Sequence, residues 1–301
     1  MAIRECPKCG RRVSDTAKAC PHCGYDMRGK RRGAKRGGRR VWIIAVAVLV
    51  VAALAVGVIF LLPEKGKKLN VGDTVLFGHY EQDGDTSDGT EPISWTVLDV
   101  QDGKALLLSD KVLDSKQYNE ERVDITWETC TLRTWLNGEF MDAVFSEEEK
   151  SVIALMRVVN QNNAIYGTDG GNDTDDQIFL LSLNDVQEYY TLQELPAYDY
   201  VPGASDKLIC SGTEQAISNY LWTDTITERN IADWKKNYGL EYPQELLGTE
   251  ACLWWLRSPG SNRDYAAYVD RSGRVCSDGN HVSNALSGVR PALWISLDMI
   301  P

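Results

Sequence analysis

Four cysteines near the start of the chain have the spacing of a metal site. Cys6 and Cys9 are separated by two residues, as are Cys20 and Cys23, and each pair lies in a Cys-Pro-x-Cys-Gly unit. Two intervening residues let both sulfur atoms of a pair reach one ion from a tight turn, and four thiolates complete a tetrahedral zinc shell without an open position. We therefore expect residues 1–27 to form a small unit held together by a structural zinc ion, with His22 as a bystander.

A basic segment and an apolar segment follow this unit and predict a membrane anchor. Residues 28–40 form a linker with eight Lys or Arg among glycines, a composition that stays flexible and suits anionic lipid headgroups. Residues 41–62 contain no charged residue and no proline. Twenty-two helical residues extend about 33 Å, which is enough to cross a bilayer. A cleaved signal peptide ending near Ala53-Leu54-Ala55 is the alternative, but the apolar segment continues beyond that point.

The charge distribution predicts the orientation of the anchor. Residues 1–40 hold 13 Lys or Arg and three Asp or Glu, whereas the whole chain has 32 and 43. Because positive charge stays on the cytoplasmic side, we expect a single-pass cell-membrane protein with a cytoplasmic N-terminus, a stalk at 63–69 and an extracellular domain at 70–301. The reducing cytoplasm also favours zinc over two disulfides at the four cysteines. The acidic outer domain excludes nucleic acid as its partner.

The outer segment predicts an α+β domain. We expect strands at 71–80, 93–100, 104–109 and 177–181, helices at 132–145, 147–156, 182–190, 214–221 and 228–238, and short strands at 253–256, 266–269, 274–277 and 289–295. Ser146 with Glu149 and Ser182 with Asp185 have the spacing of helix capping boxes. Strands and helices do not alternate regularly, which argues against a doubly wound parallel sheet.

Several motifs of the outer segment carry a family resemblance. The chain has WWLRSPG at 254–260, AYVD at 267–270 and GVRPAL at 288–293, preceded by GDTVLFG at 72–78 and TLRTWLN at 131–137. With these motifs, residues 70–301 resemble a bacterial family of domains of unknown function that is common on the surface of Gram-positive bacteria. The resemblance implies a C-type-lectin-like fold, similar to that of formylglycine-generating enzymes, and no particular activity. The N-terminal unit similarly resembles the zinc ribbons of bacterial membrane proteins.

Acidic side chains between 169 and 176 are candidate calcium ligands. Asp169, Asp173, Asp175 and Asp176 lead directly into a predicted buried strand, and carboxylate oxygens suit a hard cation such as Ca²⁺. The alternative interpretation is a solvated loop.

Aromatic and polar side chains near the C-terminus are candidate ligand contacts. Trp255, Arg257, Asn262, Tyr265 and His281 combine ring faces with hydrogen-bonding groups, which suits a carbohydrate or a peptide held in the loops 258–266 and 278–288. The alternative is that a tryptophan packs inward and Arg257 pairs with a buried acid.

The outer domain shows no assembled catalytic set, so we assign no catalytic residue and expect a surface protein that binds a glycan, cell-wall material or another protein. An oxidase related to formylglycine-generating enzymes, acting through Cys252 and Cys276, is one alternative, and a transmembrane sensor signalling through the zinc ribbon is another. Cys130, Cys210, Cys252 and Cys276 are either buried thiols or paired in disulfides, and their spacing does not select a pairing.

Overall fold

The computed structural model describes residues 3–6, 8, 11–14, 16–23, 60–61, 68–190, 192, 204–239 and 242–299. The chain divides into two compact units, Met1–Val56 and Gly57–Pro301, and each is described by itself.

The predicted membrane anchor is largely outside this range. The linker at 28–40, nearly all of the span at 41–62 and most of the stalk at 63–69 are not among the described residues. Within the described part of the chain, no helix is both long and apolar enough to cross a membrane. Phe60 and Leu61, at the end of the predicted span, form strand β3 (Phe60–Leu61), which pairs in parallel with β4 (Thr74–Tyr80). The predicted helix therefore does not include these two residues, because their backbone extends a sheet.

The N-terminal unit contains one short antiparallel hairpin. Strands β1 (Ile3–Glu5) and β2 (Arg12–Ser14) pair with Ile3 opposite Ser14. Among the described residues of this unit, Cys6, Val13 and Cys20 are buried. A unit this small buries little apolar surface, so a bound metal would contribute to its stability.

A six-stranded sheet forms one half of the larger unit, in the order β10-β18-β6-β5-β4-β3. Its further strands are β5 (Glu91–Gln101), β6 (Lys104–Ser109), β10 (Ile178–Phe179) and β18 (Ala292–Ser296). In β5, Ile93, Trp95 and Val97 alternate with less buried residues, so one face of this strand packs on the core. The Trp95 indole N–H donates to the Phe77 carbonyl oxygen at 2.7 Å, which satisfies its buried donor.

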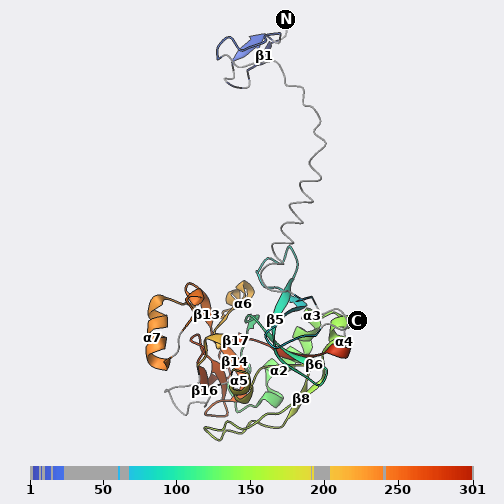
Figure 1. The fold of residues 1–301 in the computed structure, drawn as a ribbon, viewed down its shortest axis with the longest axis vertical. Helices are drawn as coiled ribbons and strands as arrows, with labels where there is room; N and C mark the ends of the chain where they lie inside the picture. The colour runs from blue at the N-terminus through green and yellow to red at the C-terminus, as the bar shows by residue number, and fades with distance from the viewer. Residues whose placement is uncertain are drawn as a thin grey trace. The chain divides into compact units, whose positions relative to one another are not determined.

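A five-stranded sheet forms the other half, in the order β16-β15-β14-β17-β7. Its members are β7 (Asp114–Ser115), β14 (Trp254–Pro259), β15 (Tyr265–Val269), β16 (Val275–His281) and β17 (Gly288–Val289). Every residue of β14 is buried, because this central strand is covered on both faces. The chain passes directly from β17 in this sheet to β18 in the first, so the two halves lie beside each other (Figure 1).

Short helices connect the strands. They are α2 (Thr131–Trp135), the π-helical segment η2 (Leu136–Phe140), α3 (Met141–Val144), α4 (Glu147–Val152) and α5 (Leu183–Tyr189), with 3-10 turns η1 (Trp127–Thr129), η3 (Asp206–Leu208), η4 (Gln244–Leu246) and η5 (Leu297–Met299). The capping boxes predicted for α4 and α5 are both confirmed. The helix predicted to run to residue 156 ends at Val152, because Met156 begins strand β8 (Met156–Val158), which pairs with β9 (Thr174–Asp176).

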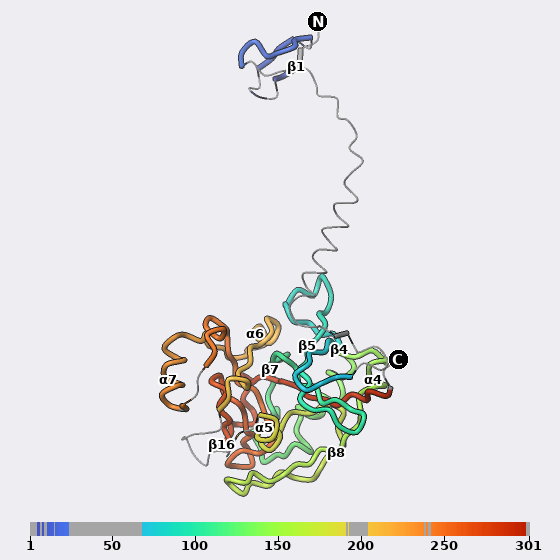
Figure 2. The backbone as a smooth tube through the Cα atoms, in the orientation of Figure 1, coloured from blue at the N-terminus to red at the C-terminus, as the bar shows by residue number. Residues whose placement is uncertain are grey.

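Residues 211–251 form a lobe with a small core of its own. The lobe holds α6 (Glu214–Ser218), β12 (Thr223–Thr225) and α7 (Glu228–Tyr238), and α7 lies at the periphery of the domain in Figure 2. Strands β11 (Cys210–Ser211) and β13 (Glu250–Cys252) stand at the base of the lobe and pair antiparallel. Ile226, Trp234, Tyr242 and Ala251 make a hydrophobic cluster separate from the main one. The predicted mixed α and β architecture is thus confirmed.

Candidate functional site

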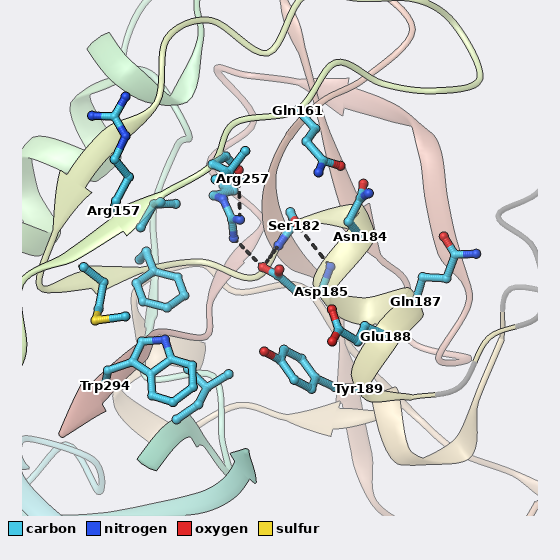
Figure 3. A pocket seen from close by; sticks show the side chains of 15 residues that line it. Arg157, Gln161, Ser182, Asn184, Asp185, Gln187, Glu188, Tyr189, Arg257 and Trp294 are labelled. Carbon is cyan, nitrogen blue, oxygen red and sulfur yellow. Dashed lines mark hydrogen bonds and ion pairs between the residues drawn. The ribbon is translucent and has the colours of Figure 1, made fainter. Parts of the chain in front are cut away.

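A cavity of about 520 Å³ opens beside α5 and β8 (Figure 3). It is lined by Leu106, Met156, Arg157, Val158, Val159, Gln161, Phe179, Ser182, Asn184, Asp185, Gln187, Glu188, Tyr189, Arg257 and Trp294. Its volume lies in the range of about 300–1,000 Å³ that is typical of small-molecule sites.

Arg257 holds together the segments that form one wall of the cavity. Its side chain is only 6% exposed. One terminal nitrogen, Nη1, donates to the Leu180 carbonyl oxygen at 2.7 Å and to the Asp185 carboxylate at 2.5 Å, and Nη2 donates to the Val159 carbonyl oxygen at 3.2 Å. A rigid guanidinium can serve three acceptors in fixed directions, which a lysine cannot. Arg257 thus pairs with an acid, as the alternative interpretation has it, but Asp185 is half-buried and not buried.

Asp185 belongs both to this ion pair and to the start of α5. Its carboxylate accepts the backbone N–H of Ser182 at 2.8 Å, while the Ser182 hydroxyl accepts the N–H of Asp185 at 3.0 Å. This capping box fixes the direction in which α5 leaves the wall. As a result, Asn184, Gln187 and Glu188 lie around the cavity in Figure 3.

The remaining lining separates into an apolar floor and a polar rim. Phe179 and Trp294 are nearly fully buried and supply ring surface. Burial and the charge of Asp185 raise the pKa of Tyr189, so its hydroxyl stays protonated and available as a donor. The side chains of Gln161, Asn184, Gln187 and Glu188 have no protein hydrogen-bond partner within the described ranges. These groups are therefore free to meet a ligand.

The charges around the cavity are balanced. Arg257 is paired with Asp185, and Arg157 lies 3.4 Å from Asp173 and 4.0 Å from Asp175. Both cations of the lining thus face carboxylates, and Glu188 has no hydrogen-bond partner among the residues that the structure describes.

The five predicted ligand contacts do not converge. Trp255 is 0% exposed and its indole N–H donates to the Lys116 carbonyl oxygen at 2.9 Å, so its ring presents no face to a ligand. Both tryptophans of the motif at 254–260 are buried, because β14 is covered on both sides. Of the five, only Arg257 lines the cavity.

Tyr265 and His281 do lie together, as neighbours on paired strands. Their rings are 4.4 Å apart between centroids, and the Tyr265 hydroxyl is 3.3 Å from Nε2 of His281. Asn262 is exposed, and its side-chain amide donates to the hydroxyl of the adjacent Ser261 at 3.4 Å. The cavity lies beside α5 instead of in the loops 258–266 and 278–288, where the sequence predicted it.

A second concave region of about 650 Å³ is lined by residues that include Lys116, Trp135 and Tyr220. The Lys116 ammonium lies 4.5 Å from the centre of the Trp135 ring. That aromatic face is already occupied by a cation. We take the cavity beside α5 as the candidate, where the Arg257 guanidinium lies 5.7 Å from the centre of the Phe179 ring and Trp294 supplies a second ring.

The predicted calcium ligands point in different directions. Asp176 is fully buried and accepts bonds from Trp127 Nε1 at 2.9 Å and Arg133 Nε at 2.6 Å. Asp175 is its neighbour on β9 and faces solvent, because adjacent residues of a strand alternate sides. Asp173 binds Arg157, and Asp169 accepts the N–H of Gly171. These carboxylates form no metal-sized cluster in the part of the chain that the structure describes, so the calcium prediction is not supported.

The zinc ligands do converge. The sulfur atoms of Cys6, Cys20 and Cys23 lie within 4.8 Å of one another, and those of Cys6 and Cys23 are 3.7 Å apart. Tetrahedral zinc with Zn–S bonds of about 2.3 Å requires sulfur atoms about 3.8 Å apart. Cys9, the fourth predicted ligand, is outside the described residues. The donor set therefore fits a structural zinc ion.

The outer cysteines are buried free thiols. Burial raises the pKa of Cys130 and of Cys276 to about 12, and raises that of Cys252 as well. Cys252 lies opposite Cys210, whereas Cys276 lies opposite Tyr268. The strand pairing thus places Cys252 opposite Cys210 and not opposite Cys276, the partner that the oxidase alternative would require.

We compared the sequence of the chain with models of protein families. A family model described as a domain of unknown function, DUF6273, matches residues 102–297, and a zinc-ribbon model matches residues 6–27. The chain belongs to the DUF6273 family. The DUF6273 match includes the motifs at 254–260 and 288–293 as well as the whole cavity lining. No curated protein and no solved structure matches the chain.

Sequence reasoning missed the cavity residues on α5. The signal that could have found them was the predicted capping box at Ser182 and Asp185. It marks the start of a helix whose exposed face carries Asn184, Gln187 and Glu188 beside the tyrosines at its end.

Proposed function

We propose that the DUF6273 domain binds a neutral carbohydrate in the cavity beside α5. The observation that carries the proposal is the combination of a ring-lined floor, formed by Phe179 and Trp294, with a rim of amide groups that have no partner among the described residues. Sugars present apolar C–H faces to aromatic rings, while their hydroxyl groups both donate and accept hydrogen bonds. Amide and carboxylate side chains supply both functions.

The charge balance of the cavity supports a neutral ligand over an anionic one. Arg257 is paired with Asp185, and Arg157 lies 3.4 Å from Asp173, so a phosphate or uronic acid would compete with carboxylates that already face both guanidinium groups. The carboxylate of Glu188, which has no partner in the described part of the chain, would repel such a ligand and can accept a hydrogen bond from a hydroxyl group of a neutral sugar.

The experiment uses the full-length chain in detergent micelles and neutral oligosaccharides, including fragments of cell-wall polymers. Binding is measured on an array and then by calorimetry. We expect Asn184→Ala to weaken binding at least fivefold, by about 1 kcal/mol for one lost hydrogen bond. Asn237→Ala is the matched control, because it removes the same exposed amide from α7. The proposal is refuted if no neutral glycan binds, or if both variants bind as the wild type does.

We also propose that the chain is a single-pass membrane protein with the zinc ribbon in the cytoplasm and the DUF6273 domain outside. The support is the uncharged apolar segment 41–62 behind the basic segment 28–40. Protease treatment of intact cells should remove the DUF6273 domain and spare the ribbon. Recovery of an intact chain would contradict this orientation. The C-type-lectin-like fold stays a prediction from the family resemblance.

A further inference from the structure

Cys210 and Cys252 lie directly opposite each other at the base of the lobe. They are register partners in the antiparallel pair formed by β11 and β13. The Cys252 thiol donates to the Cys210 carbonyl oxygen at 3.2 Å. Opposed side chains point to the same face of a sheet with Cβ atoms about 4.5–5.5 Å apart, and a disulfide needs about 3.5–4.5 Å. A small approach of two short strands is therefore enough to join the sulfur atoms.

The position of the pair gives a bond between them a structural consequence. Both cysteines belong to the main hydrophobic core. The chain between them, 211–251, forms the lobe with its separate small cluster. The pair thus stands at the two ends of the segment that carries this separate cluster, although Ala216 and Leu221 within the segment still belong to the main core. A covalent bond at this point would close the lobe into a loop and restrict its unfolded conformations.

Arg290 places a positive charge beside both thiols. It is buried, its Nε donates to the Ser109 carbonyl oxygen at 2.9 Å, and its Nη1 has no hydrogen-bond partner within the described residues. Burial raises the pKa of both cysteines, and the charge of Arg290 opposes this rise at each of them. A neighbouring cation favours the thiolate, which is the nucleophile of disulfide exchange.

We propose that Cys210 and Cys252 form a disulfide that closes the lobe when the chain folds in the presence of a small-molecule disulfide. One cysteine thiolate attacks the oxidant, forming a mixed disulfide and releasing one oxidant thiolate. The second cysteine thiolate then attacks the mixed disulfide at the protein sulfur and releases the other. The two cysteines lose two electrons and two protons, and the oxidant is recovered as two thiols.

The other outer cysteines serve as matched controls. Cys276 lies opposite Tyr268, and Cys130 caps the start of α2 through its sulfur. Both are buried thiols, yet neither has an opposed cysteine in the described strands. If burial alone decided which cysteines form a disulfide, all four would behave alike. The strand register instead predicts a bond between Cys210 and Cys252.

The test refolds the full-length, zinc-loaded chain in detergent with oxidised and reduced glutathione. The denatured product is then alkylated with a maleimide, digested and mapped by mass spectrometry. We expect one peptide pair linked through Cys210 and Cys252, two fewer maleimide adducts than in reduced protein, and a melting temperature about 5–15 °C higher than that of the reduced form. Cys276→Ala should keep the link, and Cys210→Ala should abolish it.

Full alkylation of Cys210 and Cys252 after oxidative refolding would overturn the proposal, as would a link from either one to Cys130 or Cys276. Because glutathione is supplied in the experiment, the result does not depend on where the domain lies in the cell. Carbohydrate binding is measured separately, so the two proposals can fail independently.

Discussion

Replacing Arg257 by methionine should destabilise the DUF6273 domain more than any surface substitution. Methionine retains the apolar part of the side chain but removes all three donated hydrogen bonds. The Leu180 carbonyl oxygen, in a residue that is 0% exposed, would lose its guanidinium donor. The Asp185 carboxylate would lose its cation but keep the Ser182 N–H.

The size of the effect follows from these contacts. Removing one partner of a buried ion pair costs about 3–5 kcal/mol, because the other charge is left uncompensated. The Asp185 side chain is 24% exposed and keeps its backbone donor. We therefore expect the lower end, about 3 kcal/mol, which corresponds to a melting temperature about 6–12 °C lower for a domain of this size.

Urea denaturation, followed by tryptophan fluorescence, measures the loss without screening the ion pair as guanidinium would. Arg229→Met is the control, because Arg229 is 91% exposed and lies 3.7 Å from Asp233 on the surface of α7, where an ion pair contributes little. In a double-mutant cycle, Asp185→Asn should cost less in the Arg257→Met background than alone. If Arg257→Met unfolds at the same urea concentration as Arg229→Met, the contacts of Arg257 with Leu180, Asp185 and Val159 do not stabilise the domain as argued.

Three further predictions test other parts of the structure. Elemental analysis should find one zinc ion per chain in the wild type and in Cys276→Ser, and none in Cys20→Ser. Equal zinc contents in the two variants would contradict the ligand assignment. Asp176→Asn should lower stability to urea by about 3 kcal/mol, because Asp176 is buried and bonded to Arg133 and Trp127, whereas exposed Asp175→Asn should change it little. The buried thiols should weaken the fold at high pH. Burial raises the pKa of Cys130 in the folded protein to about 12, whereas the same thiol has a pKa near 9 in the unfolded chain. The protonated thiol therefore contributes its full stabilisation of the fold below pH 9, and this contribution is lost as the pH rises from 9 to 12. In urea titrations at several pH values, Cys130→Ala should reduce the fall in the free energy of unfolding between pH 9 and 12. An unchanged fall would show that Cys130 is not its source.

Much of the local structure could be predicted from short sequence patterns. The capping boxes at Ser146 and Ser182 are confirmed because the bonding groups are three residues apart in the chain. The hairpin of β5 and β6 turns at Asp102 and Gly103, both with positive φ, as the Asp-Gly pair predicts. The zinc donors could be predicted from the duplicated motif: Cys20 and Cys23 meet through their two-residue separation, whereas Cys6 reaches Cys23 across 17 residues.

The interpretation of the C-terminal motif required the tertiary structure. The sequence of β14 is compatible with either an exposed or a buried strand. Only the elements packed on both of its faces show that Trp255 is buried and that Arg257 lines the cavity. The acidic run at 169–176 is similar. Carboxylates close in sequence suggested one cation, but strand alternation directs Asp175 outward and Asp176 inward, where Arg133 already supplies the positive charge.

The sequence by itself determined the zinc site, through its duplicated cysteine motif, and the helix starts and hydrophobic strands, because these depend on groups within a few residues of one another. Only the tertiary structure decided the cavity and the opposed pair of Cys210 and Cys252. Arg257 reaches Asp185 across 72 residues and Cys252 meets Cys210 across 42. Contacts at such separations depend on the order and register of the strands, which arise from packing of the whole core and have no local signature.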